Sequence, residues 1–532
     1  MDSIIVRMKI KTSNLFFGLS VLFLCLVYFL FAFKNPFKTN SLVSNLEPYP
    51  DTLYYSVPAW NLVNGKGFMM STYGHEIKKI TPPIYSLYLI PFFALFGDIR
   101  SYYFANLLLS FVSILVFAGI IRKVFGNSLF SLAIVLFLGF LFVTNYYFYN
   151  LPSLLMAENL TLCVLLILAF LLFVDISFKS VLISSFLGVF FGLIKFSNLS
   201  LSLAFLFLYT VKVFVGNKNK KFKFWYVGLL FLFSLFFIFY LISSGVFSGH
   251  VNLNKETGFS FGYFIKNLSF YLSALMGRNT RYLWYTKKLM ARSVVVLAFC
   301  GVVAGLLMKK FRVLVLKLLV FLFVPVICVC FFYYADARYI FMVLPLVLIL
   351  IGFLFFVLMK KFGARLSYLL MFLLMVFYVF EKDEGERRIV FFKKQVGLNF
   401  RHKEDPWNYL AIENFNNYFK NKNKDVYLGS FLPPFYVDIF SNHNYEYLPI
   451  FEKQEFSSGQ KKILDKFYVG ELVEYYKSLV ENEKKVFVSN YYVNNSVGWR
   501  KVFDDLLANF DTELVRDGCL GSCNIYKLSL KR

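Results

Sequence analysis

Long apolar runs alternate with short clusters of Lys and Arg along the first 380 residues of the chain. Several runs reach the roughly 18 residues that an α-helix needs to cross about 30 Å of hydrocarbon. The pattern therefore predicts a polytopic α-helical membrane protein with about eleven spans. The predicted spans are 14–33, 101–121, 128–146, 157–174, 180–195, 198–215, 225–243, 293–308, 313–333, 340–358 and 366–380.

The basic clusters lie at alternate ends of these spans. Arg122 and Lys123 follow the second span, the densest cluster (218–223) separates the sixth from the seventh, and Lys360 and Lys361 follow the tenth. Short cytoplasmic loops of membrane proteins are rich in Lys and Arg. We therefore expect a multi-pass protein of the cell (inner or plasma) membrane, with its N-terminus in the cytoplasm and its C-terminus outside.

The pattern changes after residue 380, where charged residues and Asn become common. Short apolar groups typical of strands occur there at 426–428, 445–448, 486–488 and 525–528. They alternate with helical patterns over 407–419, 463–479 and 497–510. This alternation predicts a small α/β domain. We expect two domains, a membrane module (1–380, with its first outer loop at 34–100) and an extracytoplasmic α/β domain (381–532). An extracytoplasmic tail would allow a disulfide between its two cysteines, Cys519 and Cys523.

Composition agrees with the membrane assignment. The chain is 58% hydrophobic, with 70 Phe among 532 residues, and a soluble protein that apolar could not cover its surface with polar groups. The net charge of +25 would indicate nucleic acid in a soluble protein. Here the basic loops of a membrane protein account for it, so no nucleic-acid partner is expected. No cofactor can be predicted from the sequence, and whether the protein binds a divalent metal is left open.

Asp51 is the first carboxylate after the first predicted span and should lie at the outer membrane surface. At that surface an acidic group can act as a base on a substrate delivered by lipid. Asp51 could be this base. Alternatively, its side chain caps a short helix beginning at Leu53, and the two roles can coexist.

A second acid, Glu158, begins the fourth predicted span. Carboxylates at such a boundary are costly and usually functional, although this one could simply reach water. Fixed cations at the same surface could bind an anionic substrate. The candidates are Lys78, Lys79, Arg281 with its neighbour Tyr282, and Arg338 with its neighbour Tyr339. Each basic residue could instead anchor the chain on lipid headgroups.

The loop from Asp51 to Gly97 resembles the first outer loop of the polyprenyl-phosphate-sugar-dependent glycosyltransferases of the GT-C fold. That superfamily includes dolichyl-phosphate-mannose protein mannosyltransferases and bacterial aminoarabinose transferases. The order of spans and Ala337-Arg338-Tyr339 are also similar, so the resemblance covers about 360 residues. The loop residues that carry it are Asp51, Tyr54, Tyr55, Ala59, Gly65, Gly67, Pro82, Pro83, Ile84, Tyr85, Phe96 and Gly97.

The resemblance implies that Asp51 lies at the reacting centre as the base for the acceptor, because inverting transfer of a sugar from a phosphate leaving group needs no acid for that group. It also implies that an acid at the start of the fourth span, here Glu158, is catalytic and orients the acceptor or a metal. The family often has a Lys directly before the Pro pair, whereas Ile80 and Thr81 follow Lys79 here. The implied donor-phosphate ligands are Lys78, Lys79, Arg281, Arg338 and Tyr339.

The expected activity is that of an integral membrane hexosyl- or pentosyltransferase of the cell envelope. It would move a sugar from a polyprenyl-phosphate carrier, among membrane lipids, to a protein, lipid or glycan acceptor at the outer face. One alternative is a transporter or lipid flippase, for which inverted repeats and charged or broken helices near mid-membrane are expected. The sequence shows no repeat. Another is a non-catalytic envelope assembly protein whose tail binds a partner.

Overall fold

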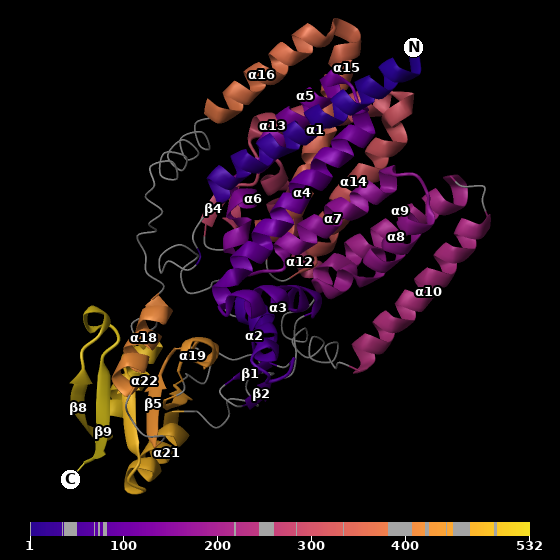
Figure 1. The fold of residues 1–532 in the computed structure, drawn as a ribbon. Coiled ribbons are helices and arrows are strands. Elements are labelled where there is room, and N and C mark those ends of the chain that lie inside the picture. The colour runs from indigo at the N-terminus through magenta and orange to yellow at the C-terminus, as the bar shows by residue number, and fades with distance from the viewer. Residues whose placement is uncertain are drawn as a thin grey trace.

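A computed structural model gives the fold of the chain. It describes residues 2–33, 36, 51–68, 70–72, 75–77, 82–216, 220–243, 260–282, 285–332, 335–380, 407–420, 425–432, 434–442, 444–450, 469–493 and 497–531. Most of the described residues before 381 form a bundle of apolar helices, here called the helical body (Figure 1).

Each predicted span coincides with a helix. The helices are α1 (Asp2–Ala32), α4 (Tyr102–Phe125), α5 (Leu129–Val143), α7 (Glu158–Phe173), α8 (Phe178–Phe190), α9 (Leu199–Gly216), α10 (Lys220–Ser243), α13 (Arg292–Leu307), α14 (Lys309–Val329), α15 (Leu344–Phe362) and α16 (Ala364–Phe380). Within the described residues, six helices are long and apolar enough to cross a membrane: α1, α4, α9, α10, α14 and α15. The others are shorter, so the count of eleven spans stays a prediction.

One predicted span is broken. Helix α5 continues into the short helix α6 (Tyr146–Asn150), and the two segments are bent by 60°. Asn145 lies at the bend, where its Oδ1 accepts a hydrogen bond from the N–H of Tyr147 at 3.0 Å. Its Nδ2 donates to the carbonyl of Leu289 at 3.2 Å. The side chain thus pairs an N–H group that the start of α6 leaves without a helical partner, and it ties the break to the segment before α13.

Close helix packing in the body depends on glycine. A Cβ atom on Gly301 of α13 would lie 2.0 Å from the carbonyl oxygen of Leu350 on α15. One on Gly305 would lie 2.5 Å from Cγ2 of Val315 on α14. Small residues let the backbones of apolar helices approach each other, so dispersion contacts can hold the helices together.

The two ends of the helical body differ. The N-terminus and the Lys/Arg-rich junctions α9–α10 and α15–α16 lie at one end, here called the basic end (Figure 1). Helix α2 (Asp51–Val63), the hairpin β1–β2 (Met70–Thr72 and His75–Ile77) and helix α3 (Ile84–Phe96) lie at the other. A second hairpin, β3–β4, is formed by Asn279–Tyr282 and Tyr285–Lys288. Its strand β3 contacts helix α12 (Phe261–Leu275) and the turn η6 (Ala337–Tyr339).

The C-terminal region forms the predicted α/β fold. Its sheet has the order β6-β5-β7-β9-β8, in which β5 is parallel to β6 and β7 and the other pairs are antiparallel. The strands are β5 (Val426–Ser430), β6 (Glu446–Pro449), β7 (Lys485–Ser489), β8 (Phe510–Arg516) and β9 (Ile525–Leu530). The helices are α18 (Trp407–Phe419), α19 (Pro434–Phe440), α21 (Val469–Glu481) and α22 (Val497–Leu507).

The C-terminal sheet lies beyond α2, away from the basic end, and α19 packs against α2 and β1 (Figure 1). The two tail cysteines, Cys519 and Cys523, form a disulfide with their Cα atoms 5.3 Å apart. Residues 381–406 lie outside the described residues, so the domain boundary at 380/381 stays a prediction.

Candidate functional site

Glu158 is the first residue of α7. A helix N-terminus carries partial positive charge and unpaired N–H groups, so a carboxylate in the first turn is favoured there. The residue is only 2% exposed. A buried carboxylate far from water requires a cation or hydrogen-bond donors.

Lys195 supplies the cation. Its Nζ lies 2.7 Å from Oε1 of Glu158, and the two side chains are 16% and 3% exposed. Lys195 has an extended backbone between two short 3-10 turns, 191–193 and 196–198, which separate α8 from α9. The second carboxylate oxygen of Glu158, Oε2, is buried and accepts no hydrogen bond from the described residues.

A second cation, Arg338, lies close enough for its charge to act on the Glu158 carboxylate. Its Nη2 donates to the hydroxyl of Tyr339 at 3.0 Å, and its backbone N–H donates to Oδ1 of Asp336 at 2.8 Å. The Arg338 guanidinium and the Lys195 ammonium each lie 4.9 Å from the centroid of the Tyr339 ring. Both are cation–π contacts, so this ring stabilises the two charges without neutralising them.

Hydrogen bonds join Asn159, the residue after Glu158, to α4 and through it to α3. The hydroxyl of Tyr85 donates to Oδ1 of Asn106 at 2.9 Å, and Nδ2 of Asn106 donates to the carbonyl of Leu154 at 2.8 Å. Nδ2 of Asn159 donates to the carbonyl of Asn106 at 2.6 Å. The start of α7 is therefore held by a buried network from two other helices.

The same network reaches the helix that carries Asp51. The ring of Tyr55 on α2 meets the ring of Tyr85 edge-on, with centroids 5.4 Å apart. Asp51 is the first residue of α2, one turn before Tyr55 and two residues before the helix start expected at Leu53. Its side chain lies outside the described residues. The backbone of Asp51 is thus on the helix that packs on α3, whose Tyr85 is hydrogen-bonded to Asn106.

The remaining candidates are placed less centrally. Arg281 lies on β3 with an exposed side chain, and β3 contacts both α12 and the turn η6 that carries Arg338. Lys78 and Lys79 lie outside the described residues. Of the sequence candidates, the structure brings together Glu158, Arg338 and Tyr339. No group of three His, Cys, Asp or Glu side chains able to hold a metal occurs in the described part of the chain.

Sequence reasoning did not select Lys195. It is the last residue of the fifth predicted span, 180–195. A lysine and a glutamate in neighbouring predicted spans could have been considered as a pair, because charges within a membrane usually have partners. The resulting site contains one carboxylate and two cations. It can attract a phosphate group while Oε2 of Glu158 accepts a hydrogen bond from a hydroxyl or amine.

Comparisons with known proteins show likeness in fold alone. No family model and no curated protein matches the sequence. The structure is similar to "ArnT from Cupriavidus metallidurans bound to Undecaprenyl phosphate", with a TM-score of 0.60, 12% identity, and coverage of 96% of this chain and 97% of that one. The apo state of the same protein matches with a TM-score of 0.61 and 11% identity, over 96% of this chain and 97% of that one. The apo oligosaccharyltransferase of Archaeoglobus fulgidus matches with a TM-score of 0.53 and 11% identity, over 94% of this chain and 73% of that one.

Proposed function

The chain has the GT-C fold, and from that premise we propose that it is a membrane glycosyltransferase that takes its sugar from a lipid phosphate. The acceptor is a protein, lipid or glycan, and the transferred unit is a hexose or a pentose. The similar ArnT structure contains undecaprenyl phosphate. The fold likeness alone does not carry the activity, so the proposal depends on the chemistry of the site.

The main support is the buried Glu158 carboxylate. Its Oε1 is paired with Lys195, its Oε2 accepts no hydrogen bond from the described residues, and Arg338 lies nearby. A purely structural ion pair gains stability when all its lone pairs are satisfied. A buried carboxylate oxygen left open beside an extra cation instead fits a site that a polar, anionic substrate completes.

The proposed reaction is a direct displacement at the anomeric carbon. The acceptor oxygen or nitrogen bonds to this carbon as the bond from the carbon to the phosphate oxygen breaks. Asp51 takes the acceptor proton, and the polyprenyl phosphate leaves as an anion. Arg338, with Tyr339 hydrogen-bonded to it, and the candidates Lys78, Lys79 and Arg281 stabilise the negative charge that develops on the phosphate.

The proposal also assigns the sides of the membrane. The basic end of the helical body faces the cytoplasm, following the positive-inside rule. Asp51 and the C-terminal domain (381–532) then lie outside the inner or plasma membrane. The disulfide between Cys519 and Cys523 supports this orientation, because disulfides persist in oxidising compartments.

The test is transfer by the purified full-length protein from synthetic polyprenyl-phosphate sugars to envelope acceptors. We expect product with the parent protein and a 10²–10⁴-fold lower rate with Asp51→Asn, as for the loss of a general base. Glu513→Gln, an exposed acid on β8, is the matched control and should keep the parent rate. Full activity of folded Asp51→Asn would remove Asp51 as the base. Lipid movement across vesicles without product would instead favour the flippase.

A further inference from the structure

Three lysines near the basic end of the helical body have no part in the proposed reaction. They are Lys123 on α4, Lys212 on α9 and Lys317 on α14. Lys212 and Lys123 both reach the end of α7, at Leu171 and Asp175, and α14 packs on α9. Lys317 is close enough for its charge to act on Lys212, so the three ammonium groups belong to one cluster drawn from three helices. The opposing charge within it is Asp175, which follows α7.

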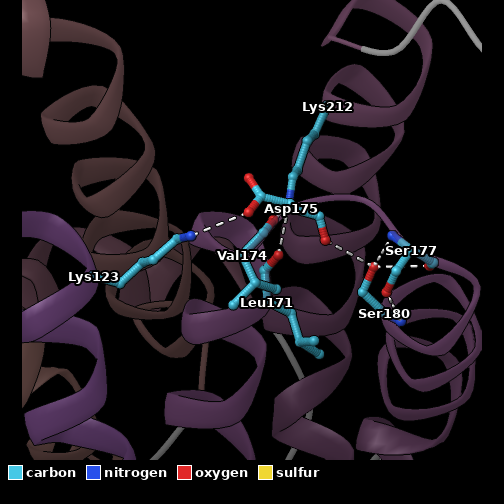
Figure 2. A network of polar contacts seen from close by, with 7 residues as sticks. All are labelled: Lys123, Leu171, Val174, Asp175, Ser177, Ser180 and Lys212. Carbon is cyan, nitrogen blue, oxygen red and sulfur yellow. Dashed lines mark hydrogen bonds and ion pairs between the residues drawn. The ribbon is translucent and has the colours of Figure 1, made fainter. Parts of the chain in front are cut away.

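Two of these lysines have clear partners (Figure 2). Lys212 donates to the carbonyl of Leu171 at 2.7 Å and to that of Val174, so it caps the C-terminal end of α7. Carbonyls in the last turn of a helix lack intrahelical partners, and a lysine there satisfies them. Lys123 pairs with Asp175 at 3.3 Å between Nζ and Oδ2.

Lys317 differs from both. It lies eight residues after Lys309, the first residue of α14, and therefore about 12 Å along the helix from that end. Its side chain is half-buried, and no hydrogen bond or ion pair joins it to another described residue. A charge within a membrane span is costly unless it is paired. With one carboxylate facing three ammonium groups, the cluster has an excess of positive charge.

The surroundings of Lys317 are apolar and exposed. Val313 and Leu316 on α14 have exposed side chains, as do Phe214 and Val215 near the end of α9. Helices α9 and α14 pack against each other, and each of these residues lies within four positions of Lys212 or Lys317 along its helix. A soluble anion gains nothing from such surfaces, whereas a phospholipid can place its acyl chains on them and its phosphate among the ammonium groups.

We propose that Lys317, with Lys212 and Lys123, binds the phosphodiester headgroup of an anionic phospholipid in the leaflet at the basic end. Basic pockets between transmembrane helices on the cytoplasmic side are suited to anionic headgroups. The lipid phosphate accepts hydrogen bonds from Lys317 and offsets the excess charge of the cluster. This site lies at the opposite end of the helical body from the sugar-transfer site and is independent of the proposed function.

The test measures the preference of the full-length protein, reconstituted in phosphatidylcholine bilayers, for spin-labelled phosphatidylglycerol over spin-labelled phosphatidylcholine. We expect Lys317→Met to lower this preference about fivefold, the effect of one lysine near an anionic membrane surface. Lys309→Met removes the same charge from an exposed position on the same helix, outside the cluster, and should lower the preference much less than Lys317→Met does. Lys317→Arg should retain it, which separates loss of charge from misfolding.

Two outcomes would overturn the inference. An equal loss in Lys309→Met and Lys317→Met would mean that the whole basic end attracts anionic lipid without a site. Displacement of the labelled phosphatidylglycerol by inorganic phosphate at matched ionic strength would mean that the lysines hold a soluble anion rather than a lipid. Retention of the label in phosphate is the expected result.

Discussion

Replacing Lys195 by Met tests whether the buried pair with Glu158 holds the site together. Two unit charges 2.7 Å apart attract by about 6 kcal/mol at an effective dielectric constant of about 20. Desolvation of both ions offsets much of this attraction, so the net contribution of the pair is small. Removing one partner is different, because it leaves the other charge buried without compensation, which costs about 3–5 kcal/mol. Arg338 remains near Glu158, so we expect the lower end of this range.

A double-mutant cycle isolates the pair from other effects of each substitution. The variants are Lys195→Met, Glu158→Gln and the combination, with the free energy of unfolding measured by denaturant titration in mixed micelles. We expect the double variant to be more stable than the sum of the single losses predicts, by a coupling energy of about 2–3 kcal/mol. Lys179→Met, at an exposed position on α8, is the matched control and should change the stability little.

A coupling energy within the roughly 0.5 kcal/mol expected for independent sites would refute the reasoning. The pair would then contribute no more than two exposed charges. Lys195→Arg adds a functional arm, because it keeps the charge while changing its geometry. If Lys195 positions Glu158 for the substrate, Lys195→Arg should be more stable than Lys195→Met and still show an altered KM.

Three further predictions concern packing, hydrogen bonding and the tail. Gly301→Leu should prevent α13 from packing on α15 and abolish monodisperse protein in size-exclusion chromatography, whereas Gly228→Leu on α10, with nothing within 4 Å of its Cβ, should be tolerated. Tyr85→Phe should lower the free energy of unfolding by about 1–3 kcal/mol, because it leaves the buried Oδ1 of Asn106 without this donor, while Tyr368→Phe at an exposed position should not. Replacing both tail cysteines by Ser should destabilise the C-terminal domain by about 2 kcal/mol, the loop-closure value for so short a loop. Limited proteolysis measures this loss, and unchanged protection from cleavage would contradict the prediction.

The helices of the body could be predicted because their signal is local. Apolar runs bounded by Lys and Arg determine where each helix lies, and every predicted span coincides with one. What interrupts a run is less visible in sequence. The 60° bend after α5 and the 3-10 turns on either side of Lys195 depend on tertiary hydrogen bonds, such as that from Asn145 to Leu289.

The tail shows the same limit. The strands β5, β6, β7 and β9 were expected from their apolar groups, but β8 was not, and the prediction of a helix as far as Phe510 was wrong. Helix α22 ends at Leu507, and β8 is mostly exposed along Asp511 to Leu514. An edge strand with polar residues on both faces lacks the alternation that identifies a strand. Its pairing with β9 is what makes it one.

Lys195 was missed for a related reason. Its partner Glu158 lies 37 residues away, and no local pattern links the two. Asp51, Glu158 and Arg338 could be selected because each interrupts an apolar context or matches a family motif. A lysine in a neighbouring span can be considered as a partner from the sequence, but only the packing of the helices shows that Lys195 meets Glu158.

The surroundings of Glu158, and the place of Asp51 at the start of α2, also suggest a different role for each acid. A proton placed on Glu158 would neutralise its carboxylate and leave Lys195 and Arg338 close together without an anion, which is unfavourable in a buried site. Glu158 is therefore suited to remain charged and to orient a substrate hydroxyl or amine through Oε2. Asp51 begins the helix that reaches this cluster through Tyr55 and Tyr85. We infer that Asp51 takes the proton. Glu158→Gln should therefore raise KM more than it lowers kcat, whereas Asp51→Asn should lower kcat more than it raises KM.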